Sequence, residues 1–136
     1  MKREILFRGK KSNGCWVYGS LVVSEHIKPA IYYEVGKGLV KQLDWCYVNS
    51  DTVGQYTGLK DKNGVKIFEG DIVKGVSHKS DSCISELIPF DVIGVVGYHK
   101  EYQTLEVRTR QASLHIEVAI KGEVIGNIHD NPELIK

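Results

Sequence analysis

The chain has 136 residues, of which 42% are hydrophobic and 26% charged, and its formal net charge is +1. This composition is typical of a globular protein with one ordinary hydrophobic core, so we expect a single domain over residues 1–136. It excludes a strong overall field for attracting nucleic acid, and no apolar run approaches the ~20 residues of a membrane helix.

The N-terminal stretch "MKREILFRGKK" is basic but has no apolar segment, so we expect no secretory signal and a location in the cytoplasm. The favoured interpretation is a solvated edge strand, because lysine on an edge strand hinders aggregation between sheets. The alternative is a strip that contacts phosphate groups and binds nucleic acid weakly. The basic residues of this strip are Lys2, Arg3, Arg8, Lys10 and Lys11.

Short runs with alternating apolar and polar residues follow along the rest of the chain. Expected strands are 15–23, 30–35, 45–48, 65–68, 71–76, 91–99, 104–110, 114–120 and 123–128. With glycine-rich connections and no long amphipathic helix, this pattern predicts an all-β, barrel-like domain, of which an SH3-like barrel is one form.

Two connections carry the same turn signature. Residues 11–14, "KSNG", and residues 61–64, "DKNG", place Asn-Gly between strand-like runs, which predicts two hairpins. In the second turn, Asp61 is expected to accept backbone hydrogen bonds, and Gly64 to adopt a positive φ.

Two other segments are not expected to form strands. Residues 77–90, "SHKSDSCISELIPF", are predicted to form a long loop or one helical turn. At the C-terminal end, Asn131 as N-cap and Pro132 at the first helical position predict a short helical turn.

The stretch "DKNGVKIFEGDIVKG", residues 61–75, contains the densest group of carboxylates and glycines. A calcium-binding EF-hand loop that began at Asp61 would need other residues at the positions of Val65, Lys66 and Ile72, so that motif fails. In a strand, Glu69 and Asp71 would share one face, as a metal site or an acid–base pair requires. Because Gly70 lies between them, we favour a bend at which Asp71 accepts hydrogen bonds from backbone N–H groups.

The cysteines and histidines show no metal-ligand spacing, and we expect no cofactor. Cys15, Cys46 and Cys83 are interpreted as reduced thiols. The first two adjoin tryptophans in strand-like runs and are expected to be buried.

Three blocks of the sequence resemble the YopX family of phage and prophage proteins: "FRGKKSNGCWVYGSL", "TVGQYTGLKDKNGVKIFEGDIV" and "EVIGNIHDNPEL". The resemblance implies a small, mainly β protein encoded by a bacteriophage or prophage, with no established biochemical activity. Phe68 and His129 depart from the family pattern, in which we expect tyrosine and an aromatic residue. The matching positions are Arg8, Gly9, Trp16, Gly19, Tyr56, Thr57, Gly58, Asp61, Gly64, Glu69, Gly70, Asp71, Gly126, Asn127, Asn131 and Pro132.

Two hypotheses about function follow. The favoured one is a non-enzymatic accessory module that binds a protein or nucleic acid, with homo-oligomerisation left open. The alternative is a metal-dependent hydrolase or nuclease that uses Asp61, Glu69 and Asp71. No residue is assigned to catalysis, cofactor binding or metal binding. The candidate interaction or motif positions are Arg8, Trp16, Tyr56, Asp61, Glu69, Asp71, Asn127 and Asn131.

Overall fold

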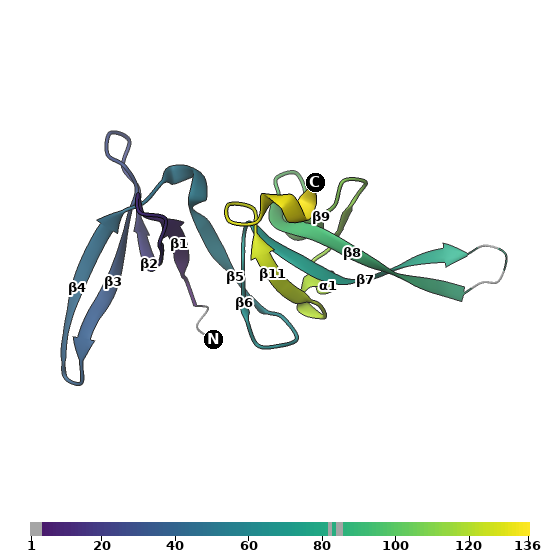
Figure 1. Cartoon of the computed structure of the whole chain (residues 1–136), viewed down its shortest axis with the longest axis horizontal. Coiled ribbons are helices and arrows are strands. Elements are labelled where there is room, and N and C mark those ends of the chain that lie inside the picture. The colour runs from purple at the N-terminus through teal and green to yellow at the C-terminus, as the bar shows by residue number, and fades with distance from the viewer. Residues whose placement is uncertain (1–3, 82, 84–85) are drawn as a thin grey trace. The chain divides into compact units, whose positions relative to one another are not determined.

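The computed structural model describes residues 4–81, 83 and 86–136, and most of them lie in antiparallel strands (Figure 1). The predicted all-β class is therefore confirmed. Contacts between residues divide the chain into two compact units, residues 1–56 and 57–136, with the boundary inside one strand. The prediction of a single domain stays a prediction. The helices among the described residues are all too short or too polar to cross a membrane.

Unit 1 consists of neighbouring antiparallel strands and one helical turn. Its strands are β1 (Phe7–Lys10), β2 (Trp16–Val22), β3 (Ala30–Lys37), β4 (Val40–Tyr47) and the start of β5 (Gly54–Lys60), and the 3₁₀ turn η1 is Ser50–Thr52. The strand order is β4-β3-β2-β1-β5. Because β1 pairs with β2 on one side and with β5 on the other, the predicted N-terminal edge strand is wrong. The exposed edge of this unit is β4.

The predicted "KSNG" hairpin joins β1 to β2. The amide of Gly14 donates to the carbonyl of Lys11 at 2.9 Å, and Gly14 has a φ of +86°. The amide of Cys15 donates to Oδ1 of Asn13 at 3.0 Å, so the asparagine side chain closes the turn. This prediction is confirmed, but Cys15 is exposed and Cys46 half-buried, so the predicted burial of Cys15 is wrong.

Unit 2 contains the rest of β5 and a second sheet. Its elements are β6 (Lys66–Phe68), β7 (Asp71–Asp81), β8 (Glu86–His99), β9 (Thr104–Arg108), β10 (Ser113–His115), helix α1 (Glu117–Ile120), β11 (Glu123–Asn127) and the 3₁₀ turn η2 (Pro132–Ile135). The sheet order is β10-β9-β8-β7-β11. The core is formed by Ile67, Val73, Val96, Val107 and Ala119.

The sheet of unit 2 is open, in contrast to the expected barrel. Between its two outer strands, β10 and β11, the chain forms helix α1. This helix packs Ala119 into the core beside β7. The strand predicted over 114–120 is wrong for the same reason, and the strand ends at His115.

The longest hairpin of unit 2 corrects a second prediction. Strands β7 and β8 remain paired from Ile72 and Val95 out to Asp81 and Glu86, so residues 77–81 and 86–90 lie in strands instead of the predicted long loop or helical turn. Residues 82, 84 and 85 of that prediction lie outside the described residues. Figure 1 shows the distal part of this hairpin extending away from the rest of unit 2. A two-stranded ribbon in solvent has no buried face, and its sequence therefore lacks the apolar alternation by which strands are recognised.

Candidate functional site

The carboxylate of Asp61 organises the second predicted hairpin. Its Oδ1 accepts hydrogen bonds from the amides of Asn63 at 2.8 Å and Val65 at 3.0 Å, while Oδ2 accepts from the amide of Val124 at 2.9 Å. Gly64 has a φ of +79°, and its amide donates to the carbonyl of Asp61 at 3.0 Å. The predicted turn is confirmed, and Asp61 additionally joins it to β11.

The electrostatics of Asp61 agree with this geometry. Burial by itself raises the pKa of a carboxyl group, since it penalises the charged form. The three backbone amides, from Val124, Val65 and Asn63, together with the charge of Lys62, outweigh that effect and lower the pKa of Asp61 below its ordinary value of 3.8. The carboxylate is thus an ionised structural acceptor.

Asp71 has a similar role at the next bend. Its Oδ2 accepts a hydrogen bond from the amide of Phe68 at 2.7 Å, and only 2% of the residue is exposed. Gly70, at the bend, has a φ of +89°. The predicted function of Asp71 in closing the bend is confirmed, while Glu69 lies half-buried beside it.

The structure does not gather these acids into a metal site. Across residues 4–81, 83 and 86–136, no cluster of three or more His, Cys, Asp and Glu side chains is placed to hold a metal ion. Asp61 and Asp71 each stabilise a separate turn through backbone amides.

The C-terminal candidates also belong to a turn. Oδ1 of Asn127 accepts from the amides of His129 and Asp130, each at 3.0 Å. Asn131 precedes η2 as predicted, but its side chain does not cap that helix. Its Oδ1 instead accepts from the amide of Asn127 at 3.3 Å, and it lies where a β-carbon on Gly126 would be. The side chain of Asn131 therefore bonds back to β11, and the missing side chain of Gly126 leaves room for it.

The structure brings two N-terminal candidates, Arg8 and Trp16, together. The guanidinium carbon of Arg8 lies 4.7 Å from the centre of the Trp16 ring, and Nζ of Lys10 lies 5.6 Å from it. Arg8 is only 6% exposed, so it positions Trp16 and does not face a ligand. Tyr56, the remaining candidate, is buried.

The predicted basic strip is therefore divided. Lys2 and Arg3 lie outside the described residues. Arg8 is buried under Trp16, and Lys10 and Lys11 are half-buried at the end of β1 and in the following turn. Of the described lysines of this strip, Lys10 lies beside an aromatic ring, that of Trp16.

Five aromatic side chains share one face of the unit 1 sheet. Strand register sets Ser20 opposite Tyr32 and Tyr32 opposite Trp45, and side chains two residues apart share a face. The exposed fractions of Tyr18, Trp45 and Tyr47 are 47%, 45% and 47%. We refer to Trp16, Tyr18, Tyr32, Trp45 and Tyr47 as the aromatic face.

The opposite side of the same sheet is buried near the start of β3, whereas Val40, Gln42 and Asp44 of β4 are exposed there. Ile31, whose side chain points away from the aromatic face, is completely inaccessible to solvent, and nearby Val48 is 3% exposed. Soluble proteins seldom leave large aromatic groups clustered in solvent unless the cluster binds something. The aromatic face is therefore the surface of unit 1 best suited to binding.

Sequence reasoning missed this surface, although it contains a local signal. Trp16 and Tyr18, and again Trp45 and Tyr47, are aromatic pairs at a spacing of two. Each pair indicates one face of one strand. Only the register of β2, β3 and β4 shows that the pairs lie on the same side.

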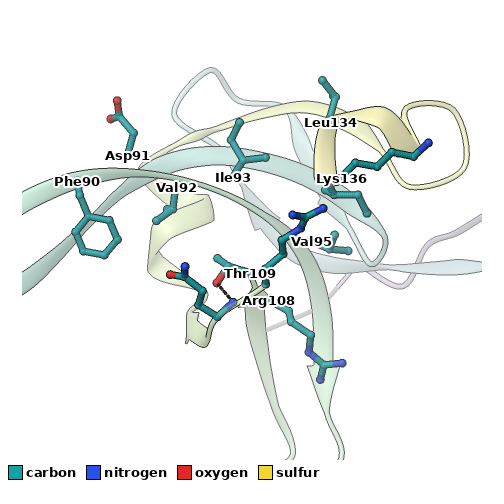
Figure 2. A pocket seen from close by; sticks show the side chains of 12 residues that line it. Phe90, Asp91, Val92, Ile93, Val95, Arg108, Thr109, Leu134 and Lys136 are labelled. Carbon is teal, nitrogen blue, oxygen red and sulfur yellow. Dashed lines mark hydrogen bonds between the residues drawn. The ribbon is translucent and has the colours of Figure 1, made fainter.

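Unit 2 has an open cavity of about 490 Å³ between β8 and the C-terminal turn (Figure 2). Nζ and guanidinium groups adjoin apolar side chains there, but Arg108 is already paired with Glu106 at 2.6 Å. This pairing reduces the charge available to a ligand. The cavity is lined by Phe90, Asp91, Val92, Ile93, Val95, Arg108, Thr109, Arg110, Gln111, Leu134, Ile135 and Lys136.

Comparison with known proteins identifies the family of the chain and a solved structure with a similar fold. A family model described as YopX protein matches residues 6–136. The crystal structure of protein EF1440 from Enterococcus faecalis is similar, with a TM-score of 0.60 and 21% sequence identity over 99% of this chain and 100% of that one. At this identity the likeness shows a shared fold alone. No curated protein matches the sequence.

Proposed function

The chain belongs to the YopX family, as its three sequence blocks predict, and from this premise we propose a non-enzymatic phage or prophage accessory module that binds nucleic acid in the bacterial cytoplasm. The single observation that carries the proposal is the aromatic face of unit 1. Exposed aromatic rings beside cationic side chains are the chemistry with which proteins bind unpaired bases and phosphates.

The charge distribution supports an anionic ligand for unit 1. Residues 1–56 contain eight Lys and Arg residues against five Asp and Glu residues, whereas residues 57–136 contain ten against twelve. On the side of the aromatic face, Lys10 adjoins Trp16, and Lys41 lies 3.8 Å from Glu34. The modest net charge of +1 for the whole chain conceals this difference between the units.

The contacts of the acidic residues favour a binding protein over a hydrolase. A catalytic metal site needs carboxylate oxygens that converge on one point and are free to bind the ion. Asp61 and Asp71 use their oxygens to accept hydrogen bonds from the amides of two different turns. The burial and the hydrogen bonds of both residues are explained by their roles in stabilising these turns.

Salt dependence of binding tests the proposal. Fluorescence anisotropy of labelled oligonucleotides should show binding that weakens as salt is raised, since phosphate contacts release counterions. Replacing Lys10 and Lys41 together by Gln should weaken binding and make the log–log slope shallower by about 1.4, at ~0.7 per phosphate on a single strand. The control variant replaces Lys79 and Lys100, two exposed lysines of unit 2, by Gln and should leave the slope unchanged. Absence of binding at low salt, or an equal effect of both variants, would contradict the proposal.

A further inference from the structure

Three rings of the aromatic face form a continuous cluster. The centroids of Tyr32 and Trp45 are 6.1 Å apart with an interplanar angle of 25°, and those of Trp45 and Tyr47 are 5.0 Å apart at 80°. These contacts limit the rotation of the rings. Trp45 lies in the middle of the cluster, and 45% of it is exposed.

We propose that this cluster binds single-stranded nucleic acid by stacking unpaired bases on Trp45 and Tyr47. The inference rests on the proposed function and specifies the form of its ligand. Unpaired bases present flat apolar surfaces, and stacking them on aromatic side chains is the main contact of many single-strand-binding sheets. In a duplex these surfaces are already stacked on neighbouring base pairs, so they are not accessible for stacking on the aromatic side chains.

Charge on the same face favours a nucleic-acid strand over a peptide segment. Lys10 and Lys41 are the exposed or half-buried cations on this side of β1 and β4, and Glu34 is the acid on this side of β3. Since Glu34 is close to Lys41, its charge is partly compensated. Phosphates that follow bases across the cluster would meet positive charge toward both β1 and β4.

The cluster is also expected to tolerate different base sequences. Stacking uses the π-face that every base possesses, whereas reading a sequence needs hydrogen-bond donors and acceptors directed at base edges. The side chains beside the rings are the small hydroxyl of Ser20, opposite Tyr32, the apolar Leu43, and Glu34, whose carboxylate lies 3.8 Å from Nζ of Lys41. We therefore expect similar affinities for mixed and homopolymeric single strands.

Intrinsic fluorescence provides a direct test, because both tryptophans of the chain belong to the aromatic face. In a Trp16→Phe variant of the full chain, Trp45 is the sole tryptophan. Single-stranded DNA and RNA 12-mers should quench its emission in a saturable manner, and the same DNA sequence annealed to its complement should quench it at least 10-fold less effectively.

Substitutions of Trp45 distinguish base stacking from electrostatic attraction to the phosphates. In the otherwise unchanged chain, Trp45→Ala should weaken single-strand binding about 5- to 150-fold, the range for losing one stacked base. Trp45→Phe, which keeps an aromatic ring, should retain most of the affinity, and thermal melts will show whether both variants fold. Tyr102→Ala serves as control, since Tyr102 is a 74% exposed tyrosine of unit 2, and it should leave binding unchanged.

The outcomes distinguish this inference from the proposed function. Equal binding of duplex and single strand, with no effect of Trp45→Ala, would overturn the stacking inference and leave nucleic-acid binding standing. No binding of either form would overturn both. A stable dimer in light scattering that Trp45→Ala dissociates would show that a second copy of the chain occupies the cluster, and this too would overturn the inference.

Discussion

The carboxylate of Asp61 accepts hydrogen bonds both within its own turn and from a strand that is distant in the sequence. Asp61 holds its own turn through Asn63 and Val65, and it also holds β11 through Val124. Burying a carboxylate is costly unless its oxygens receive hydrogen bonds, and here three backbone amides supply them. The loop whose sequence resembles a metal site is thus stabilised by hydrogen bonds from backbone amides to the carboxylate of Asp61.

Gly64→Ala should destabilise the protein by roughly 1 to 2 kcal/mol. Gly64 has a φ of +79°, and a β-carbon added there would meet no heavy atom within 4 Å apart from its chain neighbours, so the cost comes from backbone conformation and not from a clash. Asn63→Ala is the control and should cost less, since Asn63 uses its backbone amide in the turn. Urea unfolding of metal-free protein measures both. A Gly64→Ala protein as stable as the parent would contradict the turn geometry.

The lowered pKa of Asp61 predicts a specific dependence of stability on pH. A carboxyl group whose pKa is lower in the folded state contributes stability above its unfolded pKa and loses it as the pH falls through the folded value. The contribution of Asp61 should therefore be complete above about pH 5 and decline below its ordinary pKa of 3.8.

Comparison with Asp61→Asn isolates this contribution from that of the other acids. The variant should be less stable than the parent at neutral pH, and the difference in unfolding free energy should shrink toward about pH 2. A difference that stays constant between neutral and acidic pH would show that the charge of Asp61 does not stabilise the fold.

At the scale of elements, packing within unit 2 decides which glycines are required. On Gly75 of β7, a β-carbon would lie 2.5 Å from the carbonyl oxygen of Val118 and 2.9 Å from its Cγ1. Helix α1 can therefore approach β7 closely because Gly75 has no side chain. A β-carbon on Gly97, which lies on β8, would meet no heavy atom within 4 Å apart from its chain neighbours.

These two glycines form a matched pair for a test of helix packing. Gly75→Ala should cost about 1 to 3 kcal/mol, as expected when an added methyl group forces packed elements apart. Gly97→Ala should have an effect within about 0.5 kcal/mol of zero. Chemical denaturation of the two variants measures the difference, and equal stability would contradict the packing of α1 against β7.

The elements also show where prediction from sequence succeeds. Both Asn-Gly hairpins, the bend at Gly70 and the C-terminal turn were predictable, because turn chemistry depends on neighbouring residues. The strand over 114–120 was wrong because Val118 and Ile120 favour strands locally, whereas burial of Ala119 under the sheet selects a helix.

At the scale of the whole molecule, the family match and the all-β class follow from the sequence, but the proposed site does not. Asp61, Asp71, Asn127 and Asn131 drew attention because turn residues are recognisable one by one, and the structure gives them turn functions. The aromatic face depends on the register of three strands from residues 16–47. Register is a non-local property, so it was visible only in the structure.

Nuclear magnetic resonance mapping tests most directly whether the aromatic face binds nucleic acid. The ¹⁵N-labelled full chain has two indole N–H signals, from Trp16 and Trp45, which report on this face. Titration with an unlabelled single-stranded 12-mer should shift the Trp45 indole signal and the backbone amides of β2, β3 and β4, while amides of the β7–β8 hairpin stay in place. Shifts confined to residues 57–136, or no shifts at an oligonucleotide concentration that saturates anisotropy, would contradict the assignment of binding to this face.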